Sequence, residues 1–166
     1  MRIHALSRSH ELEGTPDEVF PFFADAFALE SITPDFLGFE VITPAPIESV
    51  TGTVIQYAMR LHGLPVHWTS VIQRWDPPHV FADVQLRGPY RLWHHTHRFE
   101  ALPGGRTLMR DDVRYALPLQ PVGELALPFV RRDLDRIFDY RRDVLPERLA
   151  AFRAGPPQPR ATSRGR

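Results

Sequence analysis

The middle of the chain is a series of short strand-like segments separated by turn-forming residues. Alternation and β-prone residues predict strands over residues 39–43, 53–61, 66–75, 80–87, 92–102 and 108–117. The breakers between them are Pro44 and Pro46, His62-Gly63, Pro77-Pro78, Gly88-Pro89 and Gly104-Gly105. Breakers this close together favour hairpin connections. The sequence therefore predicts an antiparallel sheet.

The N-terminal segment adds one strand and two short helices. A strand is expected over residues 3–12, and a helix begins after it. Thr15 can cap this helix, Pro16 suits its first position, and Glu18 can bond the N–H of the cap. Pro21 interrupts the aromatic-rich segment that follows. We expect two short helices there, ending near Thr33-Pro34.

The C-terminal segment carries apolar residues spaced by three and four. This spacing predicts one long amphipathic helix from about residue 124 to 152, with Pro128 near its start. Pro146 should kink or end it. The last residues, GPPQPRATSRGR, have nothing to bury. We therefore expect one domain over residues 1–153 and a disordered tail over residues 154–166.

Composition excludes several classes of function. The formal net charge is zero, so the chain lacks the excess of positive charge expected of a protein that binds nucleic acid or anionic membranes non-specifically. The chain has no cysteine, so disulfides, thiolate metal sites and cysteine nucleophiles are excluded. It has no lysine, which excludes Schiff-base chemistry. No apolar run has the length of a signal peptide or a membrane span, so we expect a cytoplasmic protein.

The order of these elements fits an α+β fold, in which a bent antiparallel sheet of about seven strands wraps around a C-terminal helix. The helical pair after TPDEVF, the WDPP turn, the DVQLRGPYRLWHHTHRFE hairpin and the FDYRRDVL segment resemble the SRPBCC superfamily. That superfamily includes START lipid-binding domains, birch-pollen-allergen-like proteins and bacterial polyketide cyclase/dehydrases. The resemblance covers approximately residues 1–150 and implies the helix-grip fold.

The resemblance also implies an apolar cavity between the sheet and the long helix. Members of the superfamily use it to bind lipids, sterols, hormones or polyketides, and a minority catalyse cyclisation, dehydration or hydrolysis with a few polar residues. This sequence is similar to a branch of small bacterial proteins from which no catalytic residue set can be carried over. No cofactor is implied, so the candidate residues must come from the sequence pattern.

The histidines of the predicted strand 92–102 are its most reactive residues. Alternate residues share a face, so His95 and His97 point the same way, about 6–7 Å apart at Cα, and His94 points the other way. Trp93 and Phe99 share the face of His95 and His97, which indicates that this face is enclosed. The two imidazoles either contact a ligand or shuttle a proton, or they only bond neighbouring strands.

A metal site is the further alternative for these imidazoles, and it needs a third ligand such as Asp83 or Asp111. A three-residue loop over residues 88–90 places Asp83 opposite His95. A register change of one residue instead pairs Asp83 with His94, outside the cavity. Because the same pairing serves an ordinary carboxylate–imidazole contact, no metal is predicted.

The last predicted strand has one largely apolar face that we expect to point inward, made of Met109, Asp111, Val113, Tyr115 and Leu117. Tyr115 would bring its hydroxyl into the cavity, and Asp111 would either pair with an arginine or orient an imidazole. The strand over residues 80–87 is ambiguous. Its aliphatic residues favour one inward face, whereas its pairing with the next strand favours the face of Asp83 and Gln85.

Three functions follow from these patterns. The first is the binding of a hydrophobic small molecule such as a lipid or polyketide, by a monomer or homodimer, although the aromatic residues also suit plain core filling. The second is a polyketide cyclase/dehydratase-like enzyme, in which His95 and His97 act as general acid and base and Asp111 orients them. The third is protein docking through the helix face or an exposed Trp75. The predicted ligand contacts are Tyr57, Trp68, Gln85, Trp93, His95, His97, Tyr115 and Phe138.

Overall fold

A computed structural model of the protein describes residues 1–155, so nearly all of the predicted tail lies outside the described residues. The strands are β1 (His4–Glu13), β2 (Glu40–Val41), β3 (Val54–Leu61), β4 (Leu64–Asp76), β5 (Val80–Arg87), β6 (Leu92–Leu102) and β7 (Arg106–Ala116). The helices are α1 (Pro16–Ala24), α2 (Ala28–Ser31) and α3 (Leu127–Ala154), with 3₁₀ turns η1 (Asp35–Leu37) and η2 (Val122–Ala126). All the predicted strands are present, although β2 is only two residues long.

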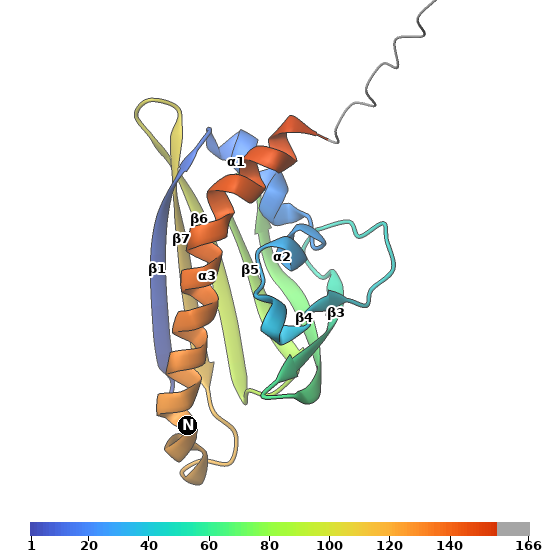
Figure 1. The fold of residues 1–166 in the computed structure, drawn as a ribbon, viewed down its shortest axis with the longest axis vertical. Helices are drawn as coiled ribbons and strands as arrows, with labels where there is room; N and C mark the ends of the chain where they lie inside the picture. Colours follow the sequence, from blue (N-terminus) through green and yellow to red (C-terminus); the bar gives the residue numbers. More distant parts are fainter. Residues whose placement is uncertain (156–166) are drawn as a thin grey trace, which may run out of the picture.

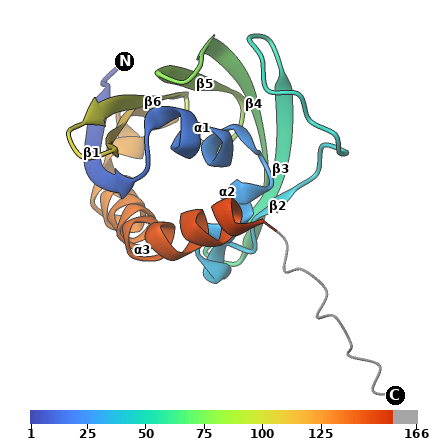
Figure 2. The same ribbon diagram turned by 90° about the horizontal axis from the view of Figure 1, so that it is seen from above.

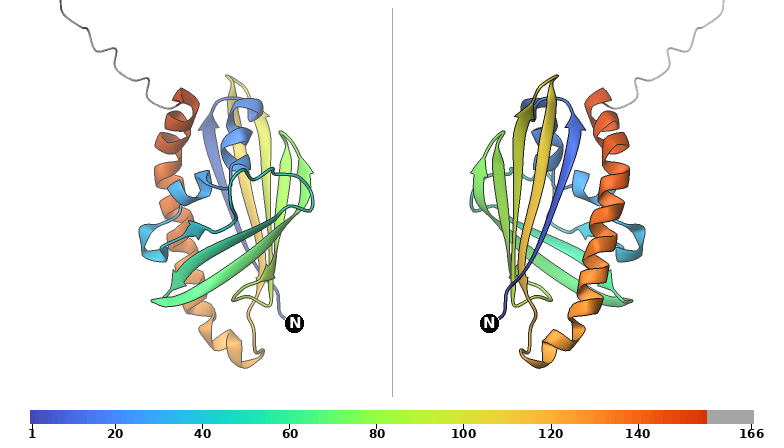
Figure 3. Two further views of the ribbon diagram at one scale, coloured as in Figure 1. Left: turned by 90° about the vertical axis from the view of Figure 1, so that its right-hand side faces the viewer. Right: turned by 90° about the vertical axis from the view of Figure 1, so that its left-hand side faces the viewer.

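The strands form one sheet in the order β1-β7-β6-β5-β4-β3-β2, and every neighbouring pair is antiparallel. The sheet curls, and α3 runs along its open side (Figures 1 and 2). Figure 3 shows α3 and the sheet as two layers, with the β3–β4 hairpin slanting across. The predicted α+β architecture is therefore confirmed.

The first helix begins where its capping residues predicted. The backbone N–H of Thr15 donates to Glu18 Oε2 at 2.7 Å, which closes the start of α1. The predicted interruption at Pro21 is wrong, because α1 continues through it to Ala24. A proline removes only one backbone hydrogen bond, and burial of the helix's phenylalanines against the sheet outweighs this loss. The break falls instead at Asp25, whose side chain accepts the N–H of Phe27 at 2.9 Å.

The long helix also differs from the prediction at its proline. Pro128 lies near the start of α3 as expected, but Pro146 does not end the helix, which continues to Ala154. Leu145 and Leu149, on either side of Pro146, are only 1% and 3% exposed. Their burial against the sheet stabilises the turn that contains the proline more than the lost hydrogen bond destabilises it.

The interior between the sheet and α3 divides into two hydrophobic clusters. We call one the packed cluster; it lies at the end covered by α1 and contains Leu12, Val19, Phe20, Phe99, Met109, Leu145 and Leu149. We call the other the pocket cluster; it contains Ile55, Tyr57, Trp68, Ile72, Trp93, Leu134 and Phe138. Phe20 of α1 fills the first with edge-to-face contacts to Phe99 at 5.3 Å and Trp75 at 5.2 Å. The second cluster surrounds an open space.

Candidate functional site

A pocket of about 210 Å³ lies between the sheet and α3. Its walls are mainly aromatic and aliphatic side chains from the strands β3, β4, β5 and β6 and the helices α1, α2 and α3. Among the predicted ligand contacts, those that line it are Tyr57, Trp68, Trp93, His95, His97 and Phe138. Trp68 and Trp93 meet edge to face at 5.2 Å, and the Trp68 indole N–H donates to Ser70 Oγ at 2.9 Å. That hydrogen bond fixes the orientation of one aromatic wall.

Two of the predicted ligand contacts do not line the pocket. Gln85 uses its amide to hold the β5–β6 turn, donating from Nε2 to the carbonyl of Tyr90 at 2.7 Å. Tyr115 faces inward as predicted, but it is 1% exposed and lies beneath Tyr90 and Trp93, with ring centroids 5.8 and 6.3 Å away. Tyr90 therefore occupies the position expected for Tyr115, because the turn that carries it folds over the end of the sheet.

The strand register decides which face of β5 points inward. Asp83 pairs with His95 and Phe81 pairs with His97, as the three-residue loop predicted. Residues opposite one another on neighbouring strands share a face. Phe81 and Asp83 therefore line the pocket with the histidines, whereas Leu86 of the aliphatic set is 59% exposed. The inward face of β5 is therefore the one favoured by its pairing with β6, not the one favoured by its aliphatic residues.

Asp111 joins the two imidazoles from the side away from Asp83. Its Oδ1 lies 2.9 Å from His95 Nε2 in a hydrogen bond. The same oxygen lies 2.7 Å from His97 Nδ1, a close ion-pair contact outside the angular range of a hydrogen bond. The expected ion pair with an arginine is wrong, because Arg110 and Arg114 lie on the opposite, outer face of β7. His94 also points outward, within 3.0 Å of Gln73 Oε1.

The two buried imidazoles have opposite pKa shifts. Burial and the neighbouring His97 lower the pKa of His95. Burial also acts to lower the pKa of His97, but Asp111 and Asp83 outweigh it and raise that pKa. Burial alone would raise the pKa of Asp111, and the imidazoles reverse this and hold it well below its usual range. The ring centroids are only 3.8 Å apart, so the two imidazoles titrate as a coupled pair.

Arg141 is a pocket residue that the sequence analysis missed. It lines the same wall as the histidines and is 8% exposed, and its Nε has no hydrogen-bond partner among residues 1–155. Burial lowers its pKa, against the opposing effect of Asp111 and Asp83. Arg141 follows Phe138 by three residues and precedes Leu145 by four, which places it on the buried stripe of α3. This spacing is a signal that could have identified it.

Two further observations concern the predicted docking role of Trp75 and the predicted location of the protein. Trp75 is half-buried, packs against Phe20 and Phe81, and lines the pocket, so the docking role predicted for an exposed Trp75 is wrong. In the part of the chain that the structure describes, no helix combines the length and the apolar character needed to cross a membrane. The cytoplasmic location and the monomeric or homodimeric state stay predictions.

No protein-family model and no curated protein sequence matches the chain, but solved structures do. The Zhui aromatase/cyclase from Streptomyces sp. R1128 has a TM-score of 0.72 at 16% identity, over 90% of this chain and 94% of that one. Norcoclaurine synthase from Thalictrum flavum, in complex with dopamine and hydroxybenzaldehyde, has a TM-score of 0.63 at 13% identity, over 88% of both chains. A START superfamily protein from Mycobacterium smegmatis has a TM-score of 0.65 at 12% identity, over 88% of this chain and 99% of that one. These structures show the fold alone: the chain has the helix-grip fold that the resemblance implied.

Proposed function

We propose that the chain binds a compact small molecule that is apolar over most of its surface and carries an oxygen at one end. The observation that carries this proposal is the uneven lining of the pocket. Aromatic and aliphatic side chains form most of its wall, whereas Asp83, His95, His97 and Arg141 are grouped together at one side. An apolar pocket with a few convergent polar groups is the usual form of a small-molecule site.

The size of the pocket favours a ring compound over a long acyl chain. Its volume of about 210 Å³ is below the roughly 300–1,000 Å³ of common small-molecule sites. The walls formed by Trp68, Trp93 and Tyr90 present both faces and edges of aromatic rings. Norcoclaurine synthase, whose complex contains dopamine and hydroxybenzaldehyde, supports this size class. We therefore propose one or two fused rings as the apolar part of the ligand.

The polar end of the ligand should be an acceptor oxygen, such as a carbonyl, phenolate or carboxylate. Arg141 is a buried guanidinium with an unpartnered Nε, counted over residues 1–155. Leaving a buried charged donor unsatisfied is costly. His97 beside it has a raised pKa and is a second donor when protonated. An oxygen placed between them would accept hydrogen bonds from both.

Thermal-shift and calorimetric titration with phenols, aromatic aldehydes, aromatic carboxylates and matched hydrocarbons tests this proposal. We expect oxygen-bearing ring compounds to raise Tm and the hydrocarbons to bind more weakly. Arg141→Gln should weaken binding about 10–100-fold, since a hydrogen bond to a charged group contributes about 1.5–3 kcal/mol.

Arg142→Gln is the matched control, because Arg142 is exposed and pairs with Asp139 and Asp143. It should bind like the wild type. The absence of stabilisation by every ring compound would contradict the proposal. Equal losses in the two arginine variants would contradict the role given to Arg141.

A second candidate function is acid–base catalysis, and the contact of Asp111 with both imidazoles favours it. A buried carboxylate that orients a histidine is the usual support of a general base. His95, with its lowered pKa, would accept a proton, and His97 would donate one. A carbonyl compound with an acidic C–H bond, as in polyketides, would suit this pair.

Exchange of such C–H protons for deuterium, followed by NMR, tests this second function. His95→Gln and His97→Gln should each reduce the exchange rate about 100–10,000-fold. His94→Gln should leave it unchanged, because that ring lies on the outer face of β6. Exchange at the wild-type rate in both His95→Gln and His97→Gln would exclude the mechanism while leaving ligand binding intact.

A further inference from the structure

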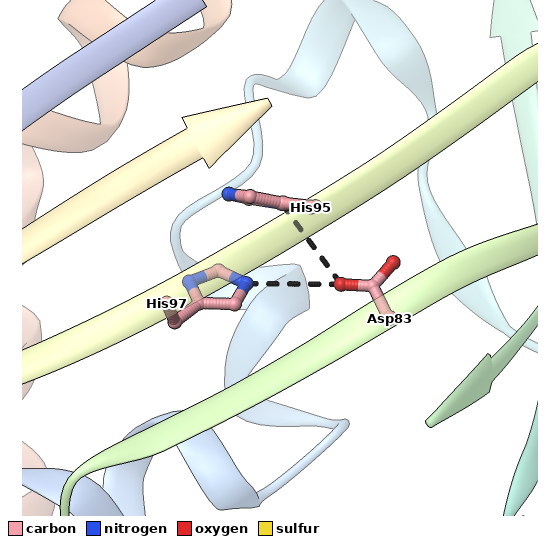
Figure 4. Close-up of side chains that lie close together, drawn as sticks. All are labelled: Asp83, His95 and His97. Carbon is pink, nitrogen blue, oxygen red and sulfur yellow. Dashed lines mark ion pairs between the residues drawn. The ribbon is translucent and has the colours of Figure 1, made fainter. Parts of the chain in front are cut away.

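Asp83, His95 and His97 each turn one potential ligand atom toward a common point on the pocket wall. Asp83 Oδ2 lies 4.0 Å from His95 Nδ1 and 3.8 Å from His97 Nε2, and the three ligand atoms all lie within 4.8 Å of one another. Figure 4 shows the Asp83 carboxylate reaching from β5 toward the two rings on β6. Both distances exceed the roughly 3.2 Å limit of a good hydrogen bond. The carboxylate therefore faces the rings without bonding either of them directly.

The opposite edges of the two rings are already occupied by Asp111. Its Oδ1 accepts a hydrogen bond from His95 Nε2, so a neutral His95 keeps its lone pair on Nδ1, the nitrogen that faces Asp83. The same oxygen lies 2.7 Å from His97 Nδ1, so a proton on that nitrogen leaves the lone pair of a neutral His97 on Nε2, which also faces Asp83. Two nitrogen lone pairs and a carboxylate oxygen then converge on one point. A single proton on one ring satisfies only part of this group. A cation between the three atoms would contact all of them at once.

We propose that Asp83, His95 and His97 bind a divalent transition-metal ion of the Zn²⁺ or Fe²⁺ class. Two imidazoles and one carboxylate are a recurrent ligand set for these ions. Metal–ligand bonds of about 2.0–2.2 Å require ligand atoms about 3.4 Å apart in a tetrahedral site, so Asp83 would move inward by about half an ångström. The two imidazole nitrogens, which lie within 4.8 Å of each other, would also turn toward the ion. Its side chain is 24% exposed and has room for this movement.

The surroundings of the three residues support a transition metal over Mg²⁺ or Ca²⁺. Those harder ions prefer shells made entirely of oxygen. Asp111 stands where an outer-shell carboxylate holds metal-binding imidazoles in place, and it supplies a second negative charge against the divalent ion. The remaining coordination positions would face the pocket, where a ligand oxygen can contact the ion and Arg141 together.

Titration of the tag-free, chelator-stripped protein with Zn²⁺, by calorimetry and by competition with a chromophoric chelator, tests this inference. We expect one ion per chain. Asp83→Asn and His97→Gln should each weaken Zn²⁺ binding by at least about 10–100-fold, and Asp111→Asn should weaken it about 10–100-fold through the orientation of the rings. His94→Gln is the matched control and should bind like the wild type.

Co²⁺ provides an independent reading of the same site through its visible ligand-field spectrum. The wild-type spectrum should be lost in Asp83→Asn and retained in His94→Gln. Failure of the stripped wild type to bind Zn²⁺, or unchanged binding in Asp83→Asn, would overturn the inference. No organic ligand is present in these titrations, so a negative result would leave the proposed ligand binding unaffected.

Discussion

The packed cluster and the pocket cluster are built from similar residues on the same sheet and helix, but only the first is filled. At its end of the sheet, α1 inserts Phe20 among Phe81, Phe99 and Trp75. At the other end, the walls made by Trp68 and neighbouring aromatic rings enclose about 210 Å³ of open space. The difference shows that the cavity lies where side chains of α1 and α2 line the space between the sheet and α3 without filling it.

The polar group of the pocket lies at the boundary between the two clusters. His97 stacks on Phe81 with ring centroids 4.1 Å apart, whereas His95 meets Phe138 at 5.8 Å and Trp93 at 6.3 Å. Phe81 of the packed cluster thus supports His97, whereas Trp93 and Phe138 of the pocket cluster lie against His95. Support of polar groups by packed side chains is the arrangement that binding and catalytic sites need.

The largest loss of stability is expected from a substitution of the carboxylate that contacts both histidines at the boundary between the clusters. Asp111→Ala should lower the free energy of unfolding by about 3–5 kcal/mol, because it leaves two buried imidazoles without their carboxylate. Urea unfolding followed by circular dichroism measures this loss. His94→Ala, on the outer face of the same strand, should stay within about 0.5 kcal/mol of the wild type. A loss below about 1 kcal/mol in Asp111→Ala would show that the boundary does not depend on this contact.

Two leucines of α3 compare the clusters directly. Leu145 is 1% exposed in the packed cluster, and Leu134 is 5% exposed at the wall of the pocket. Leu145→Ala should cost about 3–5 kcal/mol of unfolding free energy, because it opens a new cavity. Leu134→Ala should cost less, about 2–3 kcal/mol, because it only enlarges an existing one. Equal losses in chemical denaturation would contradict this difference between the two clusters.

Two buried hydroxyl groups offer a smaller version of the same comparison. Thr107 donates to the carbonyl of Gly14 at 2.7 Å beside the packed cluster, and Ser70 accepts the Trp68 indole N–H at the pocket wall. Thr107→Val should cost about 1–3 kcal/mol, because the buried carbonyl loses its partner. Ser70→Ala should cost less than about 1 kcal/mol, because water in the pocket can replace the hydroxyl. Thermal unfolding of both variants measures the two losses. A larger loss in Ser70→Ala than in Thr107→Val would mean that the pocket excludes water.

The smallest effect concerns the pH dependence at the packed end. Bonds from Thr15, together with Arg153, lower the pKa of Glu18 below its ordinary value of 4.5. Its contribution to stability is therefore complete above that value and is lost as the pH falls through the lowered pKa, since the unfolded state takes up its proton first. Glu18→Gln keeps the capping bond but should flatten stability between about pH 5 and 3. Identical pH profiles for the two proteins would contradict this assignment.

Local patterns explain why so much of the fold could be predicted. The breakers between strands and the alternation within them involve residues close in sequence, so the antiparallel hairpins could be predicted from the sequence alone. The pairing of Asp83 with His95 was one of the two registers that the sequence left open, and the structure has that one. Neither Pro21 nor Pro146 ends its helix, and the two cases have one cause. Burial of a helix face outweighed the local preference against proline.

The site was less predictable because its members come from separate elements. Asp83 comes from β5, the imidazoles from β6, Asp111 from β7 and Arg141 from α3. The alternation in β6 and β7 indicated that His95, His97 and Asp111 point inward, but no strand pattern reveals which helix residue crosses toward them. Gln85 and Tyr115 both lie on the inward faces of their strands, but neither lines the pocket. Tyr90 packs over Tyr115, and its carbonyl accepts a hydrogen bond from Gln85.

The amino-acid sequence by itself determined the hairpins between consecutive strands and the shared face of His95 and His97, because period-two alternation and turn signals act over a few residues. Only the tertiary structure decided that Arg141 lines the same pocket as Asp83 and the histidines, and that the interior stays open beside them. A cavity is the space that distant side chains leave between them, so its size and its polar wall depend on packing across the whole domain.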